Sequence, residues 1–388
     1  MKHIAIIAFT KTGTQLACQL RDALLAQASQ VSVAAPERFA SEYGVSAYDT
    51  LDAWTSEAFE TADALLFVSA TGIAVRAIAP FIRDKFVDPA VVSIDEKAQF
   101  VVPLLSGHVG GANDFAREVA ALVGAQSVVS TATDLHGIFA VDEWARNNNL
   151  AILDRALAKE ISAALLAGKD IGFESSFPIK GELPAELKMG ETLGGQTTGC
   201  EVPGNETAKN DDPTANEPSH HLMGVVVSLD PSKQPFEHTL RLVPRVVTVG
   251  VGCKHGTPGE TIEAFINECL TAAHIAPEAV STLASIDLKA DEPGLLETAS
   301  KHNWTCVFYS AEELAAVPGE FASSAFVEQT TGVDNVCERA ACAAGGQLVQ
   351  PRKSCNGVTV ALALDHDALS NLEFPPRIEG EEPSKEQQ

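Results

Sequence analysis

The 388-residue sequence contains no apolar run that approaches the ~20 residues of a membrane-spanning helix. Its first apolar run, 4–9, is broken at once by Thr10, Lys11 and Gly13, which also excludes the core of a signal peptide. Basic residues are few, since 27 Lys and Arg face 52 Asp and Glu and leave a formal charge of −25. This balance argues against nucleic acid and against an anionic membrane surface as partners.

Cysteine pairs of the C-x-x-C type are absent, although the chain has eight cysteines. Five of them lie in segments that read as strands or helices, so we expect reduced thiols in a cytoplasmic protein. The ten histidines include one adjacent pair, His220-His221, at the edge of a polar segment. We therefore expect no dedicated metal site.

Several common motifs are also missing: the Walker sequence, the dinucleotide Gly-x-Gly-x-x-Gly, the nucleophile elbow and His-Glu-x-x-His. A nucleotide-dependent α/β oxidoreductase thus remains only a weak alternative.

Short Val- and Ile-rich runs alternate with segments of helical period, which predicts strands joined by crossover helices. We expect an α/β protein whose N-terminal domain, 1–135, is a doubly wound, mostly parallel sheet. Its predicted strands are 3–9, 31–35, 64–69, 91–94, 100–104 and 127–130.

The pattern changes twice after this domain. A small middle unit, 136–244, is predicted to hold a helical segment at 142–169, a flexible acidic insertion at about 175–220 and a strand at 222–228. A second α/β domain follows at 245–366, and the acidic residues 367–388 are expected to be a solvated tail. The predicted strands of this C-terminal domain are 246–251, 282–286, 305–309 and 358–362.

One glycine-rich turn joins a strand to an amphipathic helix at 106–114. Gly107, Gly110 and Gly111 let a backbone approach a ligand closely, and the helix start offers N–H groups to an anion. His108 could donate to a carboxylate or shuttle a proton. The alternative is a tight turn whose helix is capped by Asn113 or Asp114, and the motif alone leaves both interpretations open.

Two further glycine loops follow strands. In the first, Thr71 and Gly72 precede Arg76, whose guanidinium could reach a carboxylate, although a surface arginine is the commoner outcome. The second loop, 250–259, is the most basic glycine loop in an acidic chain; its candidate binding residues are Gly252, Lys254, His255, Gly256 and Thr257. Cys253 beside Lys254 could have a lowered pKa, but a small residue in a tight loop is the simpler interpretation.

Ligands collect at the carboxyl ends of strands in open α/β sheets, and all three loops follow strands. We therefore expect them to form binding surfaces. Asp95, Asp134 and Lys289 also follow strands. Such carboxylates are candidate acids or bases, although most strand-end carboxylates cap or solvate.

Long motif strings resemble one family, the cobalt-precorrin-5A hydrolases of anaerobic cobalamin biosynthesis. The matching segments in the N-terminal half are 71–80 (TGIAVRAIAP), 84–94 (DKFVDPAVVSI), 104–114 (LLSGHVGGAND) and 130–134 (STATD). Those in the C-terminal half are 251–257, 283–295 (LASIDLKADEPGL), 330–341 (TTGVDNVCERAA) and 357–363. Cys253-Lys254-His255 stands where the family often has Cys-Arg-Arg, so positive charge is kept but bidentate guanidinium forks are lost.

The resemblance implies hydrolysis of cobalt-precorrin-5A to cobalt-precorrin-5B, with opening of a δ-lactone and release of acetaldehyde. Cobalt would arrive inside the corrinoid substrate, so no protein-bound cofactor is expected. His108 is the first candidate acid or base, with the Gly110 and Gly111 amides as donors to an oxyanion, and Asp95 and Asp134 are the other candidates for the base.

The acetate and propionate groups of the macrocycle suit backbone N–H groups and cations. The candidate substrate-binding residues are Thr71, Gly72, Arg76, Gly107, Gly110, Gly111, Asn113, Asp114, Gly252, Lys254, His255, Gly256, Thr257, Lys289 and Thr331. A non-catalytic carrier of a tetrapyrrole intermediate is the alternative function, because a stand-alone relative of the C-terminal domain occurs in the aerobic pathway. The sequence leaves the oligomeric state open, a homodimer included.

Overall fold

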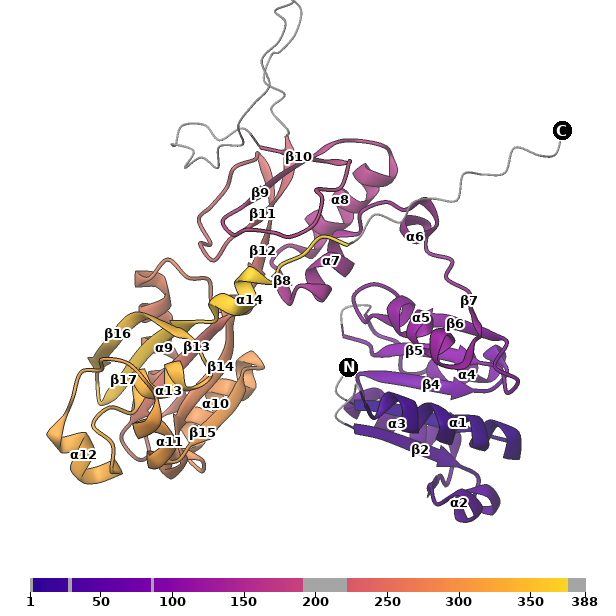
Figure 1. The fold of residues 1–388 in the computed structure, drawn as a ribbon, viewed down its shortest axis with the longest axis horizontal. Helices are drawn as coiled ribbons and strands as arrows, with labels where there is room; N and C mark the ends of the chain where they lie inside the picture. Colours follow the sequence, from indigo (N-terminus) through magenta and orange to yellow (C-terminus); the bar gives the residue numbers. More distant parts are fainter. Residues whose placement is uncertain (1–2, 27–29, 85–86, 191–221, 376–388) are drawn as a thin grey trace, which may run out of the picture. The chain divides into compact units, whose positions relative to one another are not determined.

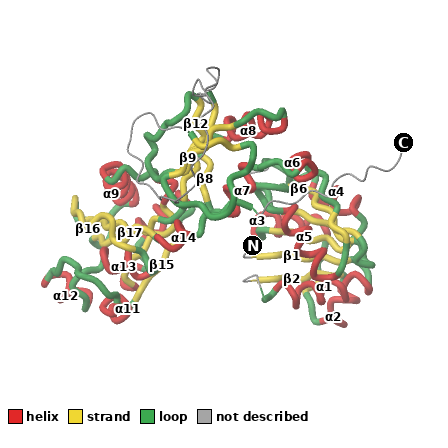
Figure 2. The backbone as a smooth tube through the Cα atoms, turned by 45° about the horizontal axis from the view of Figure 1, so that its top comes forward, coloured by secondary structure: helices red, strands yellow, loops and turns green. Residues whose placement is uncertain are grey.

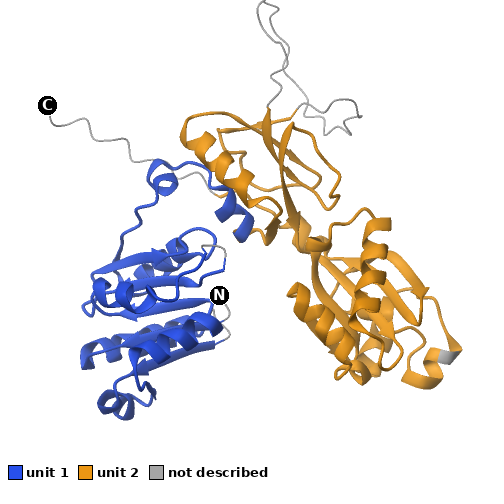
Figure 3. Cartoon of the chain, turned by 180° about the vertical axis from the view of Figure 1, so that it is seen from behind, with its two compact units in different colours: residues 1–146, 380–388 blue, residues 147–379 orange. Residues whose placement is uncertain are grey.

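The computed structural model describes residues 3–26, 30–84, 87–190 and 222–375 (Figure 1). Contacts divide the chain into two compact units, one within 1–146 and one within 147–379 (Figure 3). Within the described residues, no helix is both long and apolar enough to cross a bilayer.

The described residues of the first unit form a seven-stranded sheet in the order β3-β2-β1-β4-β5-β6-β7. Its strands are β1 (His3–Ala8), β2 (Gln30–Ala35), β3 (Ser46–Ala47), β4 (Ala64–Val68), β5 (Ala90–Ile94), β6 (Phe100–Leu105) and β7 (Gln126–Ser127). Neighbouring strands pair in parallel except β5 and β6. The predicted doubly wound, mostly parallel sheet is confirmed.

Helices cover both faces of this sheet, which is why its central strands are continuously apolar (Figure 2). These helices are α1 (Lys11–Leu24), α2 (Glu37–Tyr43), α3 (Leu51–Thr61), α4 (Thr71–Ile78) and α5 (Ala112–Val123). Two short helices, α6 (Ala132–His136) and α7 (Val141–Asn147), follow the last strand of the sheet. Helices α1 and α5 pack against Ile4, Ile6 and Val92, while α3 and α4 pack against Ile7 and Phe67 on the opposite face. All five residues of β4 are buried.

The reversed direction of β6 decides where the loops lie. The carboxylate of Asp95 accepts hydrogen bonds from the backbone N–H groups of Lys97, Gln99 and Phe100, at 2.9, 2.9 and 2.7 Å, and so shapes a hairpin between β5 and β6. Leu105 therefore ends beside Val91, at the start of β5. Each loop follows a strand as predicted, but the two loops do not meet, because loop 106–111 lies at the sheet edge opposite to loop 69–72.

The middle sheet has the order β10-β9-β11-β12-β8 among the described residues. Its elements are β8 (Leu150–Ile152), α8 (Arg155–Leu166), β9 (Ile171–Ser175), β10 (Leu187–Met189), β11 (Met223–Val227) and β12 (His238–Pro244). The continuous helical segment predicted at 142–169 is wrong. Asn149, at a φ of 52°, turns the chain into β8, and Asp154 then caps α8 through the amides of Ala156 and Leu157.

Two predicted irregular segments are partly ordered. Residues 175–190 of the predicted insertion include β10, while 191–220 lie outside the described residues. The predicted tail begins later than expected, because 366–370 form α14 (His366–Ser370) and the Phe374 ring meets Phe173 edge-on at 5.4 Å. Residues 376–388 of that tail lie outside the described part of the chain.

The C-terminal sheet has the order β15-β14-β13-β17-β16. Its strands are β13 (Val247–Cys253), β14 (Val280–Ile286), β15 (Thr305–Tyr309), β16 (Gln347–Cys355) and β17 (Val358–Leu364), and β13, β14 and β15 run parallel. Helices α9 (Gly259–Ala272) and α10 (Pro293–His302) cover one face; α11 (Ala311–Ala316) and α13 (Cys337–Ala343) cover the other. Short helices at Pro277–Ala279 and Asp287–Lys289 and α12 (Ala325–Thr331) complete the domain. The predicted second α/β domain is confirmed.

Candidate functional site

The predicted site residues fall into separate groups. Gly107, His108, Asn113 and Asp114 lie with Asp134 at one edge of the first sheet, whereas Thr71, Arg76 and Asp95 lie at the other. The candidates of loop 252–257 and Lys289 belong to the second unit, at the carboxyl ends of β13 and β14. Thr331 ends α12, where its hydroxyl donates to the carbonyls of Val327 and Val333.

We call the ionic group around His108 the His108 cluster; its members are His108, Asp114, Arg117, Asp134, Asp142, Glu143 and Arg146. His108 Nε2 lies 2.9 Å from Asp134 Oδ2 and 3.7 Å from Glu143 Oε2. On the other side of the ring, Nδ1 lies 3.3 Å from Asp142 Oδ1. The His108 side chain is only 13% exposed, so water screens these interactions weakly.

The protonation state of His108 follows from this setting. Burial alone would lower its pKa, but the hydrogen bonds to Asp134 and Asp142 outweigh burial and raise the pKa to about 10. Because both ring nitrogens face carboxylates, both carry a proton. At neutral pH, His108 is therefore an imidazolium that can give up a proton but cannot accept one.

Asp134 holds that imidazolium in place. Its Oδ2 also accepts a hydrogen bond from Asn113 Nδ2 at 3.0 Å, and Arg117 binds Oδ1. Burial would raise the pKa of the Asp134 carboxyl, but His108 and Arg117 outweigh it and hold that pKa below its usual value. Asp134 is consequently a fixed anion and a poor acceptor of a proton.

The glycines of loop 106–111 make room for the protein's own side chains. A Cβ on Gly107 would lie 2.8 Å from Asn113 Oδ1, and one on Gly111 would lie 2.6 Å from a guanidinium nitrogen of Arg146. Arg146 in turn binds Asp114. The Gly111 amide donates to the carbonyl of His108 at 3.0 Å. Gly107 and Gly111 are therefore explained by the side chains that approach them closely. The Gly111 amide is already hydrogen-bonded within the loop, so it is not free to bind an oxyanion.

Glu143 makes the longest ion-pair contacts of the cluster, at 3.7 Å to His108 Nε2 and 4.0 Å to Arg117 Nη1. Burial raises the pKa of its carboxyl, and the nearby Asp114 carboxylate raises it further. The chain thus holds a proton donor, His108, and a carboxylate of raised proton affinity within 3.7 Å of each other.

Sequence reasoning missed Asp142, Glu143 and Arg117; the acidic pair opening a helix, and an arginine three residues after Asp114, were the available signals.

His108, Asp134 and Glu143 also have the atoms to ligate a metal, all within 4.8 Å of one another. A metal ion would need the lone pair of a neutral imidazole, and it would compete with Arg117 for Asp134. The donor set fits a network of ion pairs with its own cations better than a metal centre.

The opposite edge of the first sheet carries the second group. Loop 69–72 follows β4 beside β1, where the strand order reverses, which is where ligands bind in doubly wound sheets. Arg76 folds back toward the start of α4, where its Nη1 would lie 3.7 Å from a Cβ on Gly72. Asp95, however, uses its carboxylate to shape the hairpin beside this loop.

In the second unit, the basic loop, 254–257, follows β13. Lys254 and His255 are exposed, the latter side chain by 93%, and His255 Nδ1 lies 3.2 Å from the buried Glu292 carboxylate. The Lys289 ammonium binds the same carboxylate at 2.9 Å. Burial raises the pKa of the Cys253 thiol, which argues against an activated thiolate there.

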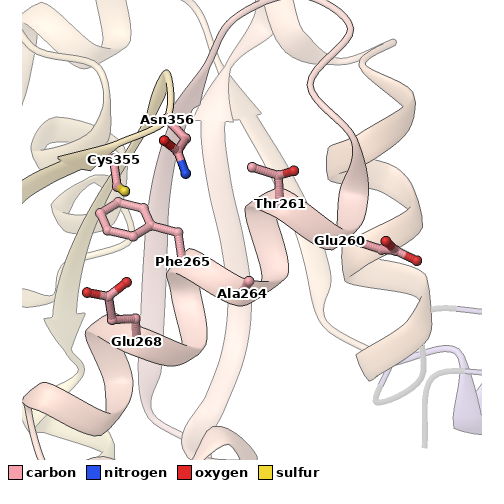
Figure 4. Close-up of a pocket in the computed structure, with 7 residues that line it drawn as sticks. All are labelled: Glu260, Thr261, Ala264, Phe265, Glu268, Cys355 and Asn356. Carbon is pink, nitrogen blue, oxygen red and sulfur yellow. The ribbon is translucent and has the colours of Figure 1, made fainter.

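A hollow of about 320 Å³ lies between α9 and the turn that joins β16 to β17 (Figure 4). Glu260 and Glu268 give it negative charge, and Phe265, Cys355 and Asn356 contribute to its lining. None of the predicted site residues lines it. An acidic hollow does not suit a substrate rich in carboxylates.

Three family profiles match consecutive parts of this chain. They are Cobalamin synthesis G N-terminal over 53–134, Cobalamin biosynthesis central region over 139–244, and Cobalamin synthesis G C-terminus over 247–363. A solved structure, a cobalamin biosynthesis protein G homologue from Sulfolobus solfataricus, matches with a TM-score of 0.40 and 21% identity. It covers 93% of this chain and 97% of that one.

Curated relatives match over most of their length. The chain is 35% identical over 312 residues to the cobalt-precorrin-5A hydrolase of Salmonella typhimurium strain LT2, covering 80% of this chain and 84% of that protein. It is 33% identical over 319 residues to the cobalt-precorrin-5A hydrolase of Priestia megaterium, covering 79% of each. The resemblance predicted from the motif strings is confirmed, and the chain belongs to the cobalt-precorrin-5A hydrolase family.

Proposed function

We propose that this protein is a hydrolase that converts cobalt-precorrin-5A to cobalt-precorrin-5B, opening the δ-lactone of the macrocycle and releasing acetaldehyde. The observation that carries the proposal is the 35% identity over four fifths of the chain to a cobalt-precorrin-5A hydrolase. The substrate is a small tetrapyrrole whose acetate and propionate groups are anionic. Cobalt enters as part of that substrate, with no metal bound by the protein itself.

The reaction consumes one water and has two bond-breaking steps. Water adds to the lactone carbonyl and the acyl C–O bond breaks, which leaves a carboxylate and a hydroxyl on the two-carbon fragment. The hydroxyl then loses its proton as the C–C bond to the macrocycle breaks. The electron pair of that bond passes to the macrocycle carbon, which takes up a proton, and the fragment leaves as acetaldehyde. Both steps need a proton donor and a proton acceptor.

The His108 cluster supplies candidates for both roles. His108, with a pKa of about 10, fits the donor, and Glu143, whose pKa is raised by burial, fits the acceptor. Asp134 and Asp142 bind the two ring nitrogens of His108 and so fix the direction of its N–H groups. His108 is therefore proposed as the general acid only. Glu143, rather than Asp95 or Asp134, is proposed as the general base.

Cations that remain available bind the substrate carboxylates in this proposal. Lys254 forms no ion pair with any residue that the structure describes, and Arg76, in the last turn of α4, folds its guanidinium back toward Gly72. In a chain of net charge −25, such local cations are needed to attract a polyanion.

The free thiols of Cys18, Cys253 and Cys269 support a reducing compartment, and we place the protein in the cytoplasm.

The proposal is tested by anaerobic incubation of the purified protein with enzymatically generated cobalt-precorrin-5A. Acetaldehyde is followed with a coupled alcohol dehydrogenase, and the corrinoid by mass spectrometry. We expect one acetaldehyde for each molecule of cobalt-precorrin-5B formed. Substrate binding without acetaldehyde would instead identify a carrier.

A further inference from the structure

The carboxylate of Glu292 is an unusual feature of the C-terminal domain. Its side chain is only 3% exposed, directly before α10, yet it accepts hydrogen bonds from three donors. Oε1 accepts from the Gly256 amide at 2.6 Å, while Oε2 accepts from His255 Nδ1 at 3.2 Å and from Lys289 Nζ at 2.9 Å. Two of these donors belong to the basic loop, 254–257.

The basic loop has few other constraints. Within it, the Thr257 amide and hydroxyl donate to the Lys254 carbonyl, at 3.3 and 2.7 Å. At its start, the Lys254 amide donates to the Gly357 carbonyl at 3.1 Å. Gly256 adopts a φ of 75°, a left-handed conformation that glycine alone adopts readily. Glu292 therefore supplies the contacts that hold the middle of the loop.

The packing beneath the loop places Glu292 between two helix starts. A Cβ on Gly294 would lie 2.2 Å from the Thr257 carbonyl oxygen and 3.0 Å from the Gly259 amide. The first turn of α10 thus abuts the first turn of α9, with the basic loop across them. A change at Glu292 would reach the loop through its bonds to His255 and Gly256 and through this close contact between Gly294 and Thr257.

The charges explain what such a loop can bind. Lys289 and Glu292 neutralise each other, so Lys289 is not a free cation. Lys254 forms no ion pair within the described residues, and the His255 ring is exposed with Nδ1 turned toward Glu292. Lys254 is left to meet an anion, beside the exposed His255 ring. The hydrogen bond from Lys289, opposed in part by burial, lowers the pKa of Glu292 to about 2, so the carboxylate stays charged in any assay near neutral pH.

We infer that Glu292 is a positioning residue for substrate binding: it fixes the basic loop so that Lys254 meets a carboxylate of the corrinoid substrate. The inference rests on the proposed function. Glu292 itself touches no substrate and takes no part in proton transfer. Its effect is therefore expected in KM rather than in kcat.

The test compares Glu292→Gln with Glu297→Gln, in the full-length protein with cobalt-precorrin-5A. Glu297 is an exposed carboxylate on α10, the helix that Glu292 precedes, so the control makes the same change of charge. Loss of the charge-assisted bonds to Gly256 and His255 is expected to raise KM by about tenfold with kcat changed less than about twofold. Glu297→Gln should leave both constants unchanged. Hydrogen exchange of the Gly256 amide should accelerate in Glu292→Gln alone.

The outcomes separate this inference from the proposed function. If Lys254→Ala raises KM but Glu292→Gln does not, the positioning role is overturned and the binding loop stands. If neither variant changes KM while acetaldehyde is released, both the loop and the inference are overturned, but the hydrolase stands. If Glu292→Gln lowers kcat at unchanged KM, the role is not positioning for binding.

A second variant covers poor folding of Glu292→Gln. Glu292→Asp keeps the charge but shortens the reach by one methylene, so it should give an intermediate KM and an intermediate exchange rate at Gly256. A wild-type KM together with faster exchange would contradict the inference, because the loop would then be loosened without any loss of binding.

Discussion

Nε2 of His108 lies 2.9 Å from Oδ2 of Asp134, although His108 precedes α5 and Asp134 lies in α6, 26 residues further along the chain. Together with the contact between Asp142 and the second ring nitrogen, this contact raises the pKa of His108 to about 10, so the ring is protonated at neutral pH. The N-terminal site is therefore organised around an imidazolium that is already protonated before substrate arrives. The predictions for His108 and Asp134 follow from that state.

The first prediction concerns stability against pH. The folded-state pKa of His108, about 10, lies above its ordinary value of 6.5, so its contribution is full below pH 6.5 and is lost as pH rises through 10. Replacement by neutral Gln removes this contribution. The difference in Tm between wild type and His108→Gln should be largest at pH 6 and shrink by pH 10. A difference that grows with pH would contradict the raised pKa.

The second prediction concerns catalysis by His108. If His108 donates the proton, His108→Gln should lower kcat by about 10²- to 10⁴-fold and change KM little, because the Lys254 and Arg76 contacts remain. Wild-type kcat should fall at high pH, as the imidazolium deprotonates near pH 10. Acetaldehyde release at saturating substrate measures both effects. A folded His108→Gln protein with wild-type kcat would remove His108 from the mechanism.

The third prediction separates Asp95 from Asp134. Asp95→Asn keeps one acceptor oxygen but turns an NH₂ group toward the remaining amides of the β5–β6 hairpin, so its Tm should fall while kcat per folded molecule stays near wild type. Asp134→Asn instead loosens His108, and kcat should fall at least tenfold by loss of positioning. Equal kcat for the two variants would contradict this division of roles.

The fourth prediction concerns Glu338, which is 2% exposed. Its carboxylate accepts from the amides of Ala322 and Arg352, at 2.9 and 2.7 Å, and from Asn335 Nδ2 at 2.6 Å. Glu338→Gln turns an N–H group toward one of these donors, which should lower the free energy of unfolding by about 1–3 kcal/mol. Urea unfolding measures the change, with the exposed Glu328→Gln as control. Equal stability of the two variants would be the contrary result.

Much of the fold was predictable because its signals are local. The strand at 64–68 reads as a continuous apolar run, and all of its residues are buried. The β16 strand was missed because its sequence, QLVQPRKSC, is polar and largely exposed at the sheet edge. Within α5, the buried stripe runs through Phe115, Ala116, Val119 and Ala120, while Leu122 of the same apolar pattern is 38% exposed.

The site was less predictable because it depends on strand direction and on distant pairs. No sequence pattern near Phe100 indicates that β6 runs antiparallel to β5, yet this direction separates His108 from Thr71. The motif identified His108 and Asp134 individually. Their partnership with Glu143 depends on a helix that begins at Val141, beyond the predicted domain boundary at 135. Such tertiary contacts leave no periodic signal in the sequence.

The most direct test of the proposed hydrolysis is turnover of cobalt-precorrin-5A in ¹⁸O-labelled water, with acetaldehyde and corrinoid mass measured in the same samples. Attack of water on the lactone carbonyl predicts one ¹⁸O in the new carboxylate of cobalt-precorrin-5B for each acetaldehyde released. Acetaldehyde released without ¹⁸O in the corrinoid would contradict lactone hydrolysis. Corrinoid bound but unchanged would contradict catalysis by this protein altogether.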